Sequence, residues 1–227
     1  MDLLFPRRCP LCDRVQPLGE IVCPQCAKAL KRVQSPFCRK CGKARADARE
    51  EYCGDCSRQK HLYTAGRALW EYPDVRRSVY RFKYGGRKEY GEFYGRELAE
   101  HLGKTILSWK PDVLVPVPLH GSRKRMRGYN QAEVLARETG KRLDIRVDTH
   151  LITRARKTMP QKMLSPAMRQ NNLKRAFKIV KNVVELNTII IVDDIYTTGS
   201  TVDAMSAALQ EAGIKHVYFI TLAIGRG

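Results

Sequence analysis

The stretch from Ile189 to Val202 constrains the fold more than any other part of this 227-residue chain. It opens with four branched apolar residues, 189–192, and continues with the carboxylates of Asp193 and Asp194. An apolar run of this kind is typical of a strand that is covered on both faces of a parallel sheet. The two carboxylates are then expected at the C-terminal end of that strand, the edge at which open α/β sheets bind ligands.

A hydroxyl-rich turn follows the acid pair and is expected to open a helix. Its residues are Tyr196, Thr197, Thr198, Gly199, Ser200 and Thr201. Backbone N–H groups, hydroxyls and the positive end of the helix dipole meet in such a turn, so it favours an anion, above all a phosphate. The neighbouring carboxylates can accept hydrogen bonds from a diol, and the whole pattern predicts a receptor for a phosphorylated ribose. The plainer alternative is an Asp-Asp pair that only caps a turn.

All eight cysteines fall into four Cys-x-x-Cys pairs: Cys9 with Cys12, Cys23 with Cys26, Cys38 with Cys41, and Cys53 with Cys56. Two such turns separated by ten or eleven residues can complete a tetrahedral zinc site. The spacing favours two structural Zn²⁺ ions bound by sequential pairs, and the interleaved pairing stays open. Four disulfides or a thioredoxin-like redox pair are alternatives. The chain start shows no apolar signal segment, so a reducing, cytoplasmic setting and zinc are favoured.

The organisation of the chain follows from its periodicity. We predict a double zinc ribbon in residues 1–61, held together by its metal because it has little apolar core, and an α/β domain in residues 62–227. Apolar patterns predict strands near 65–72, 112–117 and 217–224, with helices near 74–84, 89–102, 131–143 and 200–212. Alternating strands and helices indicate a doubly wound, mainly parallel sheet. No run of eighteen apolar residues occurs, so no membrane span is expected.

Positive charge is concentrated in one part of the α/β domain. The formal net charge is +19, and residues 120–181 carry seventeen Lys and Arg against four Asp and Glu. Four of these cations, Arg123, Lys124, Arg125 and Arg127, follow the end of the second predicted strand, in a segment expected to be a loop at the edge that carries Asp193. Such a cluster suits pyrophosphate, single-stranded DNA or both, because arginine forks bind phosphate oxygens in bidentate fashion. A solvated basic face is the alternative.

The order of these motifs resembles the ComF/GntX family of competence-type, amidophosphoribosyltransferase-like proteins. The matching features are the cysteine pairs, the Pro-Val-Pro-Leu and Arg-Gly-Tyr-Asn-Gln segments, Gln161, Leu164, Arg169, Asn172-Leu173, Ala176-Phe177 and the stretch from Asp193 to Thr201. The last stretch also resembles the 5-phosphoribosyl 1-pyrophosphate (PRPP) signature of type I phosphoribosyltransferases. The resemblance implies that Asp193 and Asp194 hold the ribose hydroxyls, that 197–201 bind the 5′-phosphate, and that Mg²⁺ accompanies PRPP. Tyr196 replaces the aliphatic residue usual in that signature.

Two functions follow from the resemblance. In naturally transformable bacteria, the family takes part in bringing incoming single-stranded DNA into the cytoplasm, which implies PRPP, DNA and a competence partner such as a DNA-translocating helicase. The alternative is an active phosphoribosyltransferase that acts on a small nucleobase or amine and has no DNA role. Residues 144–170 are predicted to form a lid over the site. We also expect replacement of Cys38 or Cys53 to unfold only the second ribbon and to leave PRPP binding largely intact.

Overall fold

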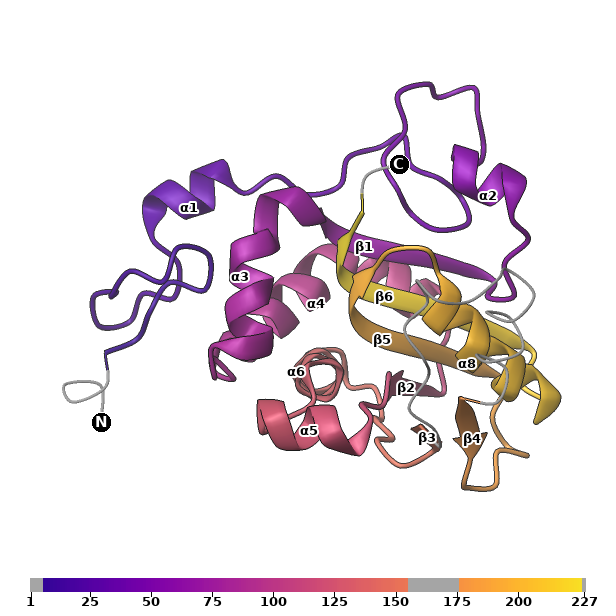
Figure 1. The fold of residues 1–227 in the computed structure, drawn as a ribbon. Coiled ribbons are helices and arrows are strands. Elements are labelled where there is room, and N and C mark those ends of the chain that lie inside the picture. The colour runs from indigo at the N-terminus through magenta and orange to yellow at the C-terminus, as the bar shows by residue number, and fades with distance from the viewer. Residues whose placement is uncertain (1–5, 155–175, 226–227) are drawn as a thin grey trace.

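The centre of the molecule is a parallel sheet. The computed structural model describes residues 6–154 and 176–225. The strands β1 (Ala65–Glu71), β2 (Val113–Pro116), β5 (Thr188–Tyr196) and β6 (His216–Ile224) lie in the order β1-β6-β5-β2 (Figure 1). All three pairings are parallel, and Ile191 of β5 lies between Val115 of β2 and Phe219 of β6. The predicted parallel sheet is therefore confirmed.

Helices and other segments cover both faces of this sheet. The helices of the α/β part are α3 (Tyr72–Tyr84), α4 (Tyr90–Ser108), α5 (Gly121–Arg127), α6 (Gln131–Leu143) and α8 (Ser200–Glu211). Ile190 and Val192 pack in one apolar cluster with residues of α3, α4 and α6, whereas Ile189 and Ile191 pack in the other with residues of α8. This alternation explains the continuous apolar run in β5. No described helix is both long and apolar enough to cross a membrane.

One local prediction differs from the structure. The segment that carries Arg123, expected to be a loop, forms the helix α5, so the loop prediction is wrong. The side chain of His120 accepts a hydrogen bond from the N–H of Ser122 at its start, and Gly128 ends it with a φ of 77°. Good helix formers such as Arg, Lys and Met fill the turns between these caps. The acid pair lies near the C-terminal end of β5, as predicted, and the strand continues to Tyr196.

The predicted lid lies largely outside the described residues. Of the predicted residues 144–170, only 144–154 are described, and they end in β3 (Ile152–Arg154), which pairs in antiparallel fashion with β4 (Phe177–Ile179) outside the predicted lid. Residues 155–175 are not described, and they include Gln161, Leu164, Arg169, Asn172 and Leu173. The lid therefore stays a prediction.

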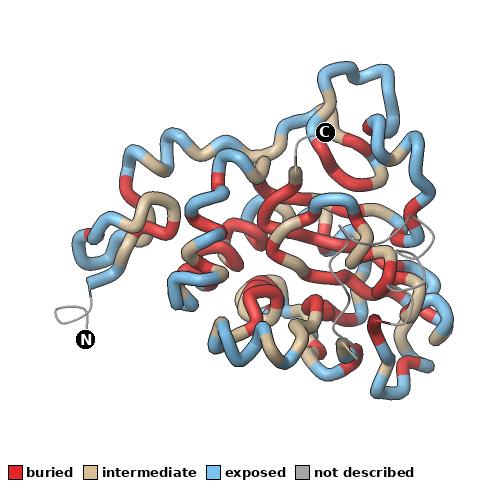
Figure 2. Tube along the Cα trace, viewed as in Figure 1, coloured by how far each residue is buried: buried red, intermediate tan, exposed pale blue. Residues whose placement is uncertain are grey.

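The two zinc ribbons occupy different places. The first carries α1 (Pro24–Ala29) and lies beside α3, whereas the second carries α2 (Gly54–Arg58) and lies beside β1 (Figure 1). Cys38, Cys41 and Cys53 of the second ribbon are buried in one cluster with sheet residues such as Phe219. Figure 2 shows the buried stretch of this ribbon against the buried strands. The second ribbon thus shares its core with the α/β domain.

Candidate functional site

The acid pair lies at the C-terminal end of β5. Lys83, in the last turn of α3, places its Nζ 2.9 Å from Oδ1 of Asp194. The N–H of Asp194 donates to Oδ1 of Asp193 over 2.8 Å. Burial, followed by the charge of Asp194, raises the pKa of Asp193 to about 7. The site therefore holds one carboxylate paired with a lysine and one carboxyl group that titrates near neutral pH.

Two cations near the acid pair were not predicted. Lys83 lies in the last turn of α3, two residues before Gly85, and only the packing of α3 on the sheet brings it to Asp194. Arg154 of β3 is the second. Its pKa is lowered by burial and by the charge of Arg123, and it is raised by the charge of Asp193. Arg154 therefore lies within electrostatic reach of both the acid pair and α5, a neighbourhood that only the fold creates.

Residues 197–201, named the phosphate loop from here on, connect β5 to α8. Gly199 adopts a left-handed φ of 79° at the N-cap of this twelve-residue helix. Thr197 and Thr198 are exposed, and Oγ1 of Thr198 lies 2.8 Å from Oγ of Ser200. The first N–H groups of a helix have no partner within it, so this turn offers donors to an anion. The structure thus brings the predicted hydroxyls together directly after the acid pair.

Tyr196 supports the phosphate loop from the core side. Its side chain is 4% exposed, its ring stacks on Phe219 with centroids 4.7 Å apart, and its hydroxyl lies 2.7 Å from that of Tyr63. A Cβ atom at Gly199 would lie 2.5 Å from the Tyr196 hydroxyl. The side chain of Tyr196 is therefore packed behind the phosphate loop, where it supports Gly199.

The segment after the second ribbon is tied to the first turn of α8. The carboxylate of Asp203 accepts hydrogen bonds from the N–H of Leu62 and from Nδ1 of His61, each over 2.8 Å. Nε2 of Gln210 donates to the carbonyl of Leu62 over 3.0 Å. These bonds hold residues 61–62 against the helix whose N-terminus carries the phosphate loop.

A small cavity separates the second ribbon from the phosphate loop. Its volume is about 160 Å³, and its lining includes Lys43, Asp55, Arg58, Thr197 and Thr198. Nζ of Lys43 lies 2.6 Å from Oδ2 of Asp55, and Arg58 also pairs with Asp55. The ribbon therefore contributes charged side chains to the immediate surroundings of the loop.

The predicted cations of α5 divide into two groups. Arg123, Lys124 and Arg125 are exposed. Arg127 is half-buried and donates hydrogen bonds to Oε1 of Gln131 and to the hydroxyl of Tyr84, each over 2.9 Å. Arg123 lies close enough to Arg154 to lower its pKa, whereas Arg127 is held against α3.

The cysteines form two compact groups that fit zinc. Cys9, Cys12, Cys23 and Cys26 make one group and Cys38, Cys41, Cys53 and Cys56 the other, with the four sulfur atoms of each group within 4.8 Å of one another. The sulfurs of Cys12 and Cys23 are 3.8 Å apart, and those of Cys41 and Cys53 are 3.6 Å apart. A tetrahedral zinc with Zn–S bonds of about 2.3 Å places its sulfurs about 3.8 Å apart, whereas a disulfide needs about 2.0 Å. Sequential pairing is confirmed, and the interleaved pairing is excluded.

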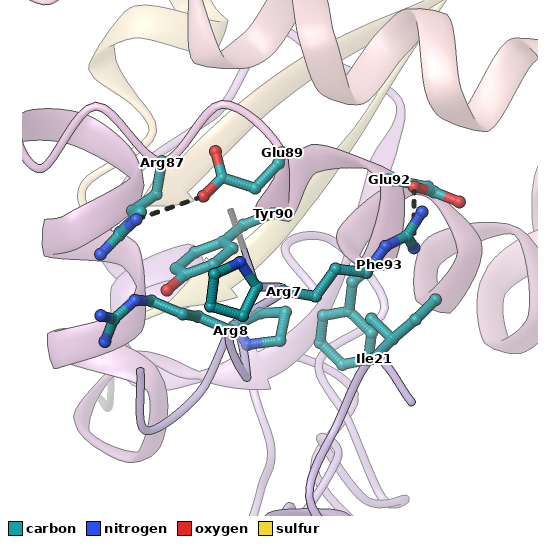
Figure 3. A pocket seen from close by; sticks show the side chains of 10 residues that line it. Arg7, Arg8, Ile21, Arg87, Glu89, Tyr90, Glu92 and Phe93 are labelled. Atoms are coloured by element: carbon teal, nitrogen blue, oxygen red, sulfur yellow. Dashed lines mark ion pairs between the residues drawn. The ribbon is translucent and has the colours of Figure 1, made fainter. Parts of the chain in front are cut away.

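A separate cavity of about 680 Å³ lies between the first ribbon and α4 (Figure 3). Four of its charged residues form two ion pairs, since Arg7 lies 3.9 Å from Glu92 and Arg87 lies 3.6 Å from Glu89. Its other lining residues are Pro6, Arg8, Pro10, Ile21, Tyr90 and Phe93. None of the predicted site residues lines this cavity, so it is distinct from the acid pair.

Two known domain families match this chain. Residues 1–57 match the double zinc ribbon domain, and residues 89–226 match the phosphoribosyl transferase domain. "DNA utilization protein YhgH" of Escherichia coli K12 is 31% identical over 212 residues, which are 92% of this chain and 86% of that protein. "Competence protein ComFC" of Bacillus subtilis 168 is 30% identical over 203 residues, which are 86% of this chain and 80% of that protein.

Two further matches cover less of the molecule. "Competence protein F" of Haemophilus influenzae Rd is 36% identical over 115 residues, so this chain spans about half the length of that relative. A purine phosphoribosyltransferase from Pyrococcus horikoshii Ot3 aligns in structure over 59% of this chain and 72% of its own, with 21% sequence identity and a TM-score of 0.36. Agreement at that level carries no argument here.

Proposed function

This chain belongs to the ComF/GntX family of proteins with a double zinc ribbon and a phosphoribosyltransferase-like domain, and from that membership we propose that it binds PRPP with Mg²⁺ and handles single-stranded DNA during its uptake. The observation that carries the PRPP part is the position of Asp193 and Asp194 directly before the phosphate loop. The names of the relatives support the DNA part, since they describe DNA utilization and competence.

Each part of PRPP has a counterpart among the residues of the site. Asp193 and Asp194 can accept hydrogen bonds from the two ribose hydroxyls, while the N–H groups of the phosphate loop receive the 5′-phosphate. Arg154 and Arg123 add positive charge on the side where pyrophosphate would leave. The oxygen ligands at this edge also fit Mg²⁺, which when bound would neutralise pyrophosphate and keep several of its waters.

Removal of the acid pair tests PRPP binding. Charge-assisted hydrogen bonds contribute roughly 1.5–3 kcal/mol each, so Asp193→Ala with Asp194→Ala is expected to weaken PRPP binding about a hundredfold or more. The measurement is calorimetric titration of the zinc-loaded protein with PRPP and Mg²⁺. Glu185→Ala, at an exposed carboxylate, is the control and should bind like the wild type. Equal affinity in the double variant and the wild type would contradict the PRPP proposal.

Salt dependence tests the DNA part. If the cations of α5 contact phosphates, the affinity for single-stranded DNA should fall with salt, with a log–log slope of about −0.7 for each phosphate neutralised. Alanine at Arg123, Lys124, Arg125 and Arg127 should flatten that slope. Lys104→Ala with Lys110→Ala removes exposed charge from the far end of α4 and should change it little. Fluorescence anisotropy at several salt concentrations gives the slopes, and identical slopes in all three proteins would remove α5 from the DNA surface.

A second function, phosphoribosyl transfer to a small nucleobase or amine without a DNA role, is favoured by one observation. Because its pKa is about 7, the carboxyl group of Asp193 can accept a proton from an incoming acceptor at neutral pH. Pyrophosphate release from PRPP in the presence of candidate acceptors would measure this activity. Acceptor-dependent release together with no affinity for DNA would favour this second function over the first.

A further inference from the structure

Two tyrosines of α3 lie exposed side by side. Tyr80 is 63% exposed and Tyr84 is 51% exposed. They are four residues apart on the helix, so they share one face, and their ring centroids are 5.1 Å apart with the planes tilted by 47°. Other aromatic residues of this region, including Phe82 and Tyr94, are buried in the core. Neither exposed tyrosine was among the site residues predicted from the sequence.

Arg127 of α5 fixes one of these rings. Its guanidinium carbon lies 4.7 Å from the centroid of the Tyr84 ring, and Nη2 donates to the Tyr84 hydroxyl over 2.9 Å. A second nitrogen of the same guanidinium donates to Oε1 of Gln131. The cation–π contact and the two hydrogen bonds restrain Tyr84 in an exposed position. The helices α3 and α5 therefore present an exposed aromatic surface in which the ring of Tyr84 is held in place.

Positive charge surrounds this surface. Arg76 and Arg77 precede Tyr80 by four and three residues and lie on the same side of α3, while Arg123, Lys124 and Arg125 lie on α5. All five are exposed, and none of them forms an ion pair with a described carboxylate. Arg81 and Arg87 differ, since both lie within 4.0 Å of Asp13. The unpaired cations therefore border the two exposed rings.

We propose that Tyr80 and Tyr84 form a stacking platform for the bases of single-stranded DNA, with the free cations of α3 and α5 on the phosphates. The proposal rests on the DNA part of the proposed function and names the surface that would carry it. Aromatic rings in a positive groove bind single strands with little sequence preference, because every base has a π-face. In a duplex the bases are already stacked on one another, so single strands are preferred.

The platform also adjoins the acid pair. Lys83, which lies between the two tyrosines in sequence, pairs with Asp194 over 2.9 Å. On the α5 side, the charge of Arg123 acts on Arg154, which in turn lies within reach of Asp193. A strand bound on Tyr80 and Tyr84 would therefore lie beside the ribose site, so PRPP and DNA are expected to influence each other's affinity.

Abasic oligonucleotides separate stacking from charge, because they keep the phosphates and lack the bases. Fluorescence anisotropy is measured with a thymidine oligonucleotide and an abasic one of equal length, at fixed salt, on the zinc-loaded full chain. We expect the wild type to bind the thymidine strand at least tenfold more tightly, as stacking predicts. Tyr80→Ala with Tyr84→Ala should lose that preference and keep its affinity for the abasic strand. Tyr80→Phe, which retains the ring, should keep the preference.

Tyr52→Ala is the matched control, because Tyr52 is 44% exposed and lies on the second ribbon. It should behave like the wild type, and circular dichroism with zinc analysis checks the fold of every variant. Equal affinity of the wild type for the thymidine and the abasic oligonucleotide would overturn the stacking proposal, while the proposal of DNA binding would remain. A double variant that keeps the thymidine preference would place the platform elsewhere. No binding of either strand would refute the DNA function itself, and polyglutamate competing as well as thymidine DNA would indicate an acidic protein partner instead.

Discussion

The first zinc ribbon and the second use the same Cys-x-x-Cys spacing, yet they contact different parts of the molecule. The first meets the outer side of two helices, where Ser78 of α3 donates to the carbonyl of Pro10 and Tyr90 of α4 donates to Asp13. A cavity of about 680 Å³ with charged residues in its lining also lies along this boundary. The apolar contacts of the first ribbon come from half-buried side chains (Leu11, Ile21, Val22 and Leu30), and none of its cysteines belongs to a core cluster. The first ribbon is therefore attached at the edge of the core.

The second ribbon is built into the core. The N–H of Gly66 in β1 donates to the carbonyl of Lys40 over 2.8 Å, and Tyr63 connects the cysteine group to Tyr196 behind the phosphate loop. The expectation that loss of Cys38 or Cys53 unfolds this ribbon alone therefore needs revision. The same Cys-x-x-Cys spacing can therefore form a module at the edge of the core in one place and part of the core in another, depending on which residues pack against it.

Removal of one thiolate from each ribbon, in two separate variants, should show the largest difference between the ribbons in folding stability and in PRPP affinity. Cys41→Ser opens a metal site in the core, and we expect the free energy of unfolding to fall by about 4 kcal/mol or more, with PRPP affinity reduced as the loop loses support. Cys12→Ser should lose its zinc, destabilise the protein by less and leave PRPP affinity unchanged. Thermal unfolding, zinc analysis and calorimetry measure the three quantities. Equal losses from both variants would remove the distinction between the ribbons.

Two glycines, one in each ribbon, allow the ribbons to be compared without a change to their cysteines. Gly42 has a φ of 78°, and a Cβ there would lie 2.7 Å from the carbonyl oxygen of Gly66, whereas Gly19 of the first ribbon has a φ of 89° and nothing within 4 Å. Gly19→Ala should cost about 1–2 kcal/mol for the left-handed backbone alone. Gly42→Ala should cost about 3 kcal/mol, because β1 must also shift. Denaturant unfolding gives both values, and equal costs would mean that the second ribbon can move away from the sheet.

The attachment of each ribbon to the α/β domain can also be weakened by changing one carboxylate. Asp203 holds residues 61–62, and Asp13 holds the first ribbon to Tyr90 and Arg87. Asp203→Asn and Asp13→Asn should each lower the free energy of unfolding by about 1.5–2 kcal/mol. Only Asp203→Asn should weaken PRPP binding, by a few fold. If Asp13→Asn weakened it equally, both ribbons would be coupled to the phosphate loop.

The pH dependence of PRPP binding should distinguish Asp203, which supports the phosphate loop, from Asp193, which we propose contacts PRPP directly. Since the ionised Asp193 accepts hydrogen bonds and its pKa in the free protein is about 7, affinity should rise about tenfold between about pH 6 and 8. The same raised pKa means that its contribution to folding stability is present below about pH 4 and is lost as the pH rises through about 7. Calorimetry should find this midpoint retained in Asp203→Asn and absent in Asp193→Asn. A midpoint unchanged in Asp193→Asn would assign it to the phosphates of PRPP.

The sequence by itself determined the features that depend on interactions between residues close together in the chain. The apolar run before Asp193 determined a buried parallel strand, the hydroxyl-rich turn determined the start of α8, and the cysteine spacing favoured the metal sites that the structure contains. These features depend on neighbouring residues and on periodicity, which are visible along the chain. The helical conformation of 121–127 was equally local, yet the prolines before it and its charge drew the prediction towards a loop.

Only the tertiary structure decided which distant residues meet. It placed Lys83 beside Asp194, Arg154 within electrostatic reach of both Arg123 and Asp193, and the second ribbon behind the phosphate loop. It also left Tyr80 and Tyr84 exposed among free cations. Contacts of this kind join residues separated by tens to more than a hundred positions. They follow from the order of strands in the sheet and from the packing of helices on it, and no spacing along the chain encodes them.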